Sequence, residues 1–126
     1  MTNKILKVGI MTLDEFKERT LNVVRGLYKV EPGEPKLWFT SLDVFSKTFS
    51  AKNRALLDLI RKKNPQSLQE LADLTGRDKG NLSRTLKKMG DMNIIQLERG
   101  PKGNLIPHVH FNRIQVDIHL DGGQAA

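Results

Sequence analysis

The sequence has no cysteine, which excludes disulfide bonds, thiolate metal sites and cysteine nucleophiles. No apolar run approaches the ~20 residues that a membrane-spanning helix needs, so we expect no membrane partner. The early stretch ILKVGIM is short and contains Lys7, which is not typical of a signal peptide. From these absences we expect a cytoplasmic protein.

The sequence has fewer acidic residues than basic ones. The chain carries 21 Lys and Arg against 14 Asp and Glu, which gives a net charge of +7 and a pI of about 9.9. Such an excess favours a polyanionic partner, most often nucleic acid and less often an anionic membrane surface. Residues 77–102 hold seven basic and three acidic side chains, and therefore four of the seven net positive charges. This placement favours nucleic acid.

What remains is the composition of a globular domain with one hydrophobic core: 126 residues, 38% hydrophobic and 28% charged. Residues 5–11 alternate as a strand does, and Thr12 with Glu15 forms a capping box that opens a helix to about residue 28. Helical spacing predicts one apolar face on it, made of Leu13, Phe16, Thr20, Val23, Val24 and Leu27. Two prolines and a glycine in residues 29–36 end this arm, so we predict a strand-helix arm over residues 1–35.

The middle of the chain predicts a series of capped helices. KLWFTS is either a strand or the lead-in to a short helix that Ser41 caps. Ser50 caps the next helix, over residues 51–63, whose expected buried residues are Ala55, Leu56, Leu59 and Ile60. A second capping box, from Ser67 to Glu70, opens a helix that Gly76 ends. Asp78 then caps a helix that runs to about residue 89.

β-rich segments follow these helices. NIIQLERG and NLIPHVHF are joined by a turn at residues 99–104, and IQVDIHL alternates as a last strand. We therefore predict an α+β fold: a winged helix-turn-helix, with a three-helix core and a β-hairpin wing, over residues 36–121. The arm precedes it, the C-terminal strand is its last element, and residues 122–126 form a flexible tail.

The helix after Asp78 has two distinct faces. Leu82, Leu86 and Met89 form a buried stripe, and Leu71 and Leu74 of the preceding helix are expected to pack on it. The opposite face offers side chains that bond base edges in the major groove or bind phosphate. We predict base contacts from Lys79, Asn81, Ser83 and Arg84. Phosphate contacts are predicted from Ser67, Arg77, Lys87 and Lys88, and wing contacts from Arg99 and Lys102.

SLQELADLTGRDKGNLSRTLKKM, continuing into GDMNIIQLERG, resembles the winged helix-turn-helix of the MarR/ArsR-like transcriptional regulators. The resemblance extends from Ser50 to about Phe111 and implies sequence-specific binding of double-stranded DNA, most simply as a repressor. The whole chain also resembles a narrower group of small predicted regulators, through MTLDEFKERTL and PKLWFTSLD. Members of that group are often encoded beside a small toxin-like protein, which implies an antitoxin that represses its own operon and binds that toxin.

Dimerisation needs a separate explanation, because the long C-terminal dimerisation helix of MarR proteins is missing. DNA sites with two-fold symmetry favour dimeric proteins, so we expect a homodimer. ILKVGIM and IQVDIHL are the candidate contacts, and they could pair with each other or across a two-fold axis.

Other functions have weaker support. His108 and His110 share a strand face and could bind zinc with His119, but no Cys or carboxylate stands at ligand spacing, so we expect no metal. We find no catalytic or phosphate-loop pattern, and we expect neither an enzyme nor a cofactor. Residues 77–102 contain no aromatic side chain on which single-stranded bases could stack, which favours duplex DNA. The alternative is a winged helix that binds a protein partner with little or only non-specific DNA binding.

Overall fold

The computed structural model describes residues 4–120, and the chain is α+β. It divides into two compact units. One, the continuous unit, consists of residues 50–112. The other, the discontinuous unit, combines residues 4–49 with residues 113–120 of the described chain. No helix within residues 4–120 is both long enough and apolar enough to cross a membrane.

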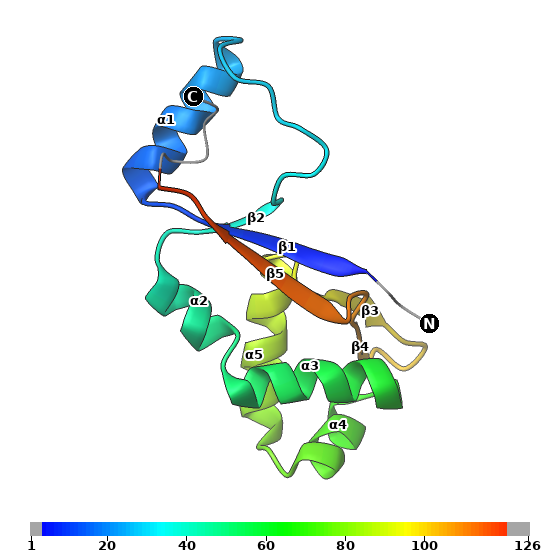
Figure 1. Ribbon diagram of the computed structural model, residues 1–126. Coiled ribbons are helices and arrows are strands. Elements are labelled where there is room, and N and C mark those ends of the chain that lie inside the picture. Colours follow the sequence, from blue (N-terminus) through cyan, green and yellow to red (C-terminus); the bar gives the residue numbers. More distant parts are fainter. Residues whose placement is uncertain (1–3, 121–126) are drawn as a thin grey trace. The chain divides into compact units, whose positions relative to one another are not determined.

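The discontinuous unit is built on a three-stranded parallel sheet in the order β2-β1-β5 (Figure 1). The strands are β1 (Ile5–Ile10), β2 (Leu37–Phe39) and β5 (Arg113–Ile118). Helix α1 (Leu13–Val24) connects β1 to β2, and α2 (Leu42–Thr48) follows β2. The predicted Thr12–Glu15 capping box is present, and KLWFTS contributes a strand.

Successive side chains of each strand lie on opposite faces of this sheet. Val8 and Phe39 are buried on one face, and the Phe39 ring packs edge-on against Phe45 of α2. On the other face the Trp38 ring lies over Gly9, where a Cβ atom would come within 2.0 Å of that ring. Glycine is therefore required at position 9 for Trp38 to lie flat on the sheet.

The predicted apolar face of α1 is correct only in part: Phe16 and Val23 are half-buried, whereas Leu13, Thr20, Val24 and Leu27 are exposed. Val24 is 79% exposed, and the helix buries Arg19 instead. The Arg19 guanidinium lies 5.0 Å from the centre of the Trp38 ring and 5.2 Å from that of Tyr28, and it pairs with Glu34 at 3.3 Å. An arginine replaces the expected aliphatic stripe because two aromatic rings and a carboxylate together compensate its loss of water.

Glu34 is the polar centre of this cluster. Burial alone would raise the pKa of its carboxyl, but hydrogen bonds from the Tyr28 hydroxyl, the Glu31 backbone N–H and Arg19 outweigh burial and lower that pKa. The hydrogen bond that Tyr28 donates to Glu34 also raises the pKa of the Tyr28 hydroxyl. The ionised carboxylate thus joins α1 to the loop before β2.

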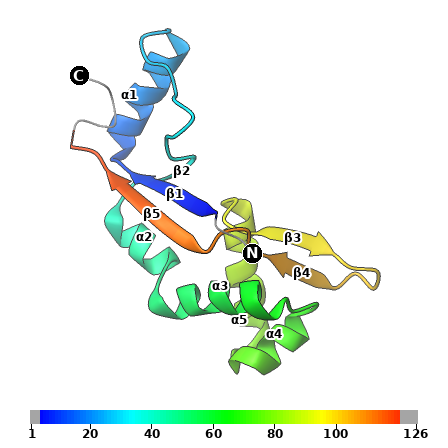
Figure 2. The ribbon, with the colours of Figure 1, turned by 45° about the vertical axis from the view of Figure 1, so that its right-hand side comes forward.

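The continuous unit contains helices α3 (Ala51–Lys63), α4 (Leu68–Thr75) and α5 (Lys79–Asp91), followed by strands β3 (Gln96–Arg99) and β4 (Leu105–His108). β3 and β4 pair antiparallel as a hairpin that extends away from the three helices (Figure 2). The predicted caps are present, since the side chains of Ser50, Ser67 and Asp78 each accept a backbone N–H of the first turn of their helix. Gly76 ends α4 with a left-handed backbone, at φ 71°.

The core of this unit follows the predicted stripe of α5: Leu82, Leu86 and Met89 are buried, together with Leu71 of α4. Two details differ from prediction. Leu74 is 44% exposed, and α3 buries Leu56, Leu57 and Ile60 in place of the set that included Ala55 and Leu59. The α3 face is rotated towards Leu57 because tertiary packing, and not the helical period alone, selects the buried positions.

The units do not follow the predicted boundary at residues 35 and 36. β2 and α2 belong with the N-terminal arm, and β5 leaves the predicted winged-helix range to pair with β1 over six residues, from Ile5–Arg113 to Ile10–Ile118. Of the two pairings left open for ILKVGIM and IQVDIHL, pairing with each other is therefore confirmed, whereas its parallel direction and register could not be read from local sequence. The predicted tail at residues 122–126 lies outside the described residues.

Candidate functional site

The exposed surface of α5 has two edges. At 100° per residue, Lys79, Ser83 and Lys87 follow one edge and Asn81 and Lys88 the other. Arg84 lies between these edges, opposite the buried stripe, and is exposed. Of the predicted base-contacting residues, Lys79 and Arg84 are exposed and Asn81 and Ser83 are half-buried, and the four do not share one edge of the helix.

One edge of α5 opens on a pocket of about 260 Å³. Lys79, Ser83 and Lys87 line it from α5, Ser67 and Gln69 from the start of α4, and Arg99 and Asn104 from the hairpin. Three of these side chains are cationic and none of the lining residues is acidic. The first backbone N–H groups of α4 add the positive end of a helix dipole. The pocket therefore has the charge and the donors to hold an anion such as a phosphate group.

The hairpin turn is fastened to the start of α4. The Asn104 Nδ2 atom donates to the Gln66 carbonyl at 2.6 Å, and Arg99 Nη1 donates to the Gly103 carbonyl at 2.9 Å. Gly103 has φ 75°, and a Cβ at Gly100 would come within 2.6 Å of the Asn104 side chain. These contacts fix the hairpin turn beside the pocket, which Arg99 lines together with Lys87.

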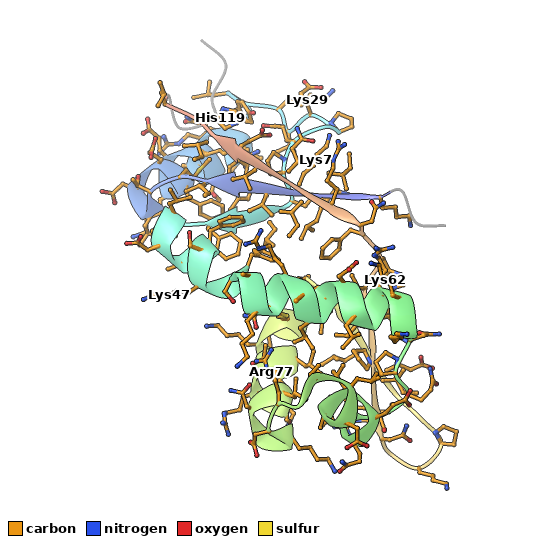
Figure 3. All side chains as sticks on the ribbon, turned by 60° about the horizontal axis from the view of Figure 1, so that its bottom comes forward. Lys7, Lys29, Lys47, Lys62, Arg77 and His119 are labelled. Carbon is orange, nitrogen blue, oxygen red and sulfur yellow. The ribbon has the colours of Figure 1, made fainter. Side chains whose placement is uncertain are left out.

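Arg77 is half-buried and is hydrogen-bonded to two asparagine side chains. Its Nε and Nη2 atoms donate to the Asn81 Oδ1 atom at 3.2 and 2.7 Å, and its Nη1 atom donates to Asn53 Oδ1 at 3.4 Å (Figure 3). Arg77 thus joins α3, the turn before α5 and α5 itself. Because its bonds use the carbonyl of the Asn81 amide, a two-bond contact from Asn81 to adenine requires Arg77 to move.

The structure thus brings together five of the predicted site residues, at the pocket: Ser67, Lys79, Ser83, Lys87 and Arg99. Arg84, Lys88 and Lys102 are exposed but do not line it. Sequence reasoning missed Gln69 and Asn104. No local signal marks Asn104, since its bond to Gln66 spans 38 positions of the chain.

His108, at the end of β4, and His110, just beyond it, both have partners on β3. His108 Nε2 lies 2.7 Å from Glu98 Oε2, and His110 Nε2 lies 3.0 Å from Gln96 Oε1. Their rings stack with centres 6.1 Å apart. Among residues 4–120 no group of three His, Cys, Asp or Glu side chains is placed to hold a metal ion. Both histidines therefore link β3 to the chain at the end of β4.

A family model described as HVO_A0114 matches residues 48–116, which is more than half of the chain. The chain therefore belongs to the HVO_A0114 family. Neither a curated protein nor a solved structure matches it.

Proposed function

We propose that this member of the HVO_A0114 family binds double-stranded DNA sequence-specifically and represses transcription. In this proposal α4 and α5 form a helix-turn-helix and the β3–β4 hairpin is the wing. The observation that carries the proposal is the cationic pocket, where Lys79 and Lys87 of α5 lie with Arg99 of the hairpin at the start of α4. A duplex offers regularly spaced phosphates beside a groove wide enough for a helix.

The pocket orients the proposed complex. A phosphate held by Lys87, Arg99 and the first N–H groups of α4 would fix the position of α5 along the backbone. Arg84, exposed opposite the buried stripe, would then point to base edges, where guanine offers O6 and N7 to a guanidinium. Lys102, at the turn of the hairpin, and Lys88 would contact phosphates outside the pocket.

A second candidate function has its own observation. Leu13, Leu21 and Val24 lie on the outward side of α1, and Leu27 just beyond it is 75% exposed. An apolar stripe of this kind is typical of a surface that binds a protein partner. It supports the interaction module as an alternative, and it would serve a toxin partner if the chain is also an antitoxin.

Selection from a random pool of duplexes, followed by anisotropy titration of the enriched sequence, tests the primary proposal. We expect the selected duplex to bind at least ten-fold more tightly than a scrambled duplex of the same length. Lys87→Ala and Arg99→Ala should weaken both, and Arg84→Ala should reduce the difference between them. Enrichment of no sequence, with no duplex binding at low salt, would contradict the proposal and favour the interaction module.

A further inference from the structure

β5 is an edge strand that lacks the usual protection against pairing. Among the described residues β1 pairs with one of its edges and no strand pairs with the other (Figure 2). It contains no proline or lysine, and its register with β1 is unbroken over six residues. Native sheets commonly shield an edge with a short strand, a proline, a bulge or charged side chains, above all lysine, and of these β5 has only one arginine and one aspartate. The opposite edge strand, β2, has only three residues, whereas β5 is long and open.

The side chains of β5 add an apolar surface to this open edge. Val116 is 36% exposed and Ile118 is 58% exposed, and both lie on the same face of the strand as Ile114. A further strand placed against β5 would cover part of these side chains while it satisfied the free backbone groups of the edge.

The charges of β5 identify the added strand. Its sequence RIQVDI carries Arg113 and Asp117 at equal distances on either side of Gln115. If two copies pair antiparallel about a two-fold axis at Gln115, each Arg113 lies directly opposite the Asp117 of the other copy. Opposite charges in such positions stabilise a strand pair, and like charges destabilise it.

Registers whose axis is shifted by one residue do not place Arg113 opposite Asp117. An axis at Val116 places Arg113 opposite His119, and an axis at Ile114 places Arg113 opposite Gln115. The Gln115 register also sets Ile114 opposite Val116, which is a β-branched pair on the apolar face. A strand from an unrelated protein has no reason to complement this charge order, whereas a second copy does so twice.

We infer that the protein forms a homodimer in which β5 pairs antiparallel with β5 of a second copy, in the register centred on Gln115. The two parallel sheets become one six-stranded sheet whose outer edges are the three-residue β2 strands. The interface is isologous and closes on itself, so no β5 edge is left for a third copy.

The absence of cysteine makes a cross-linking test direct. In the proposed register position 115 lies opposite itself, with Cα atoms about 4.5–5.5 Å apart, which a disulfide can bridge. Two copies of position 113 are about 13 Å apart, which it cannot bridge. We expect Gln115→Cys to form disulfide dimers under mild oxidation at least ten-fold faster than Arg113→Cys. Equal rates would overturn the register.

A charge exchange tests the same interface without oxidation, by sedimentation of the full chain without DNA. Asp117→Arg sets two arginine pairs in the interface and Arg113→Asp sets two aspartate pairs, so each variant should sediment as a monomer. A mixture of the two should form a heterodimer, and the double exchange should restore the homodimer, which a folding defect would not do. A monomeric wild type, or dimers that persist in both single variants, would overturn the proposal. Neither experiment depends on the proposed DNA binding.

Discussion

Removal of Lys87 and Arg99 together should change how DNA binding depends on salt. Each cationic side chain that contacts phosphate contributes about 0.9 to the slope of log K against log salt. Both side chains line the pocket at the start of α4, so Lys87→Ala with Arg99→Ala should lower the slope by about 1.8. Between about 50 and 200 mM salt the wild type should therefore lose about 12-fold more affinity than the double variant.

The assay is an anisotropy titration of a selected duplex and of a scrambled duplex, each at four or more salt concentrations. A matched control removes two lysines of the discontinuous unit, Lys36→Ala with Lys47→Ala, both of which are exposed. The net charge falls equally in both double variants, and only the pocket variant should lose slope. If the control loses as much slope, overall charge and not the pocket governs binding, and the reasoning fails.

Three further outcomes are expected. Arg84→Ala should weaken the selected duplex by about 1–3 kcal/mol and leave the scrambled duplex nearly unchanged; equal loss on both would make Arg84 a phosphate contact. Gly9→Ala should cost about 1–3 kcal/mol in urea unfolding, because its Cβ displaces Trp38, whereas Gly33→Ala, with only ordinary contacts, should cost far less. The lowered pKa of Glu34 contributes stability that is fully present above the ordinary glutamate pKa of about 4.3 and is lost as pH falls through the folded value. Glu34→Gln should flatten unfolding free energy across that acid range, and an unchanged acid dependence would exclude this contribution.

Local signals predicted the helices of the continuous unit well. Ser50, Ser67 and Asp78 cap the helices they were expected to cap, because a capping side chain acts within three residues of itself. The buried stripe of α5 follows from the helical period for a similar reason. Three residues of α5 that were predicted to contact DNA, Lys79, Ser83 and Lys87, line the pocket together, since the helix alone sets their spacing, and their contacts with DNA stay a prediction.

Contacts between distant segments were beyond the reach of such signals. From the sequence Arg19 is expected at the surface, because its contacts with the Trp38 and Tyr28 rings form only in the folded chain. The local sequence around Asn104 does not indicate a site residue, because its bond to Gln66 forms only when the hairpin folds back. Arg77 was predicted to bind phosphate from its charge, and its three hydrogen bonds to Asn53 and Asn81 arise only when α3 lies beside the turn.

The pairing of β5 with β1 has a consequence for the order in which the chain can fold as it is made. Residues 50–112 are consecutive and complete their core once the hairpin has left the ribosome. β1 precedes this unit in the chain, yet it is the central strand of its sheet and must wait for β5, more than 100 residues later. During that interval one edge of β1 has no partner within its own chain. The continuous unit can thus fold before the sheet does, and the sheet closes only after β5 has been synthesised.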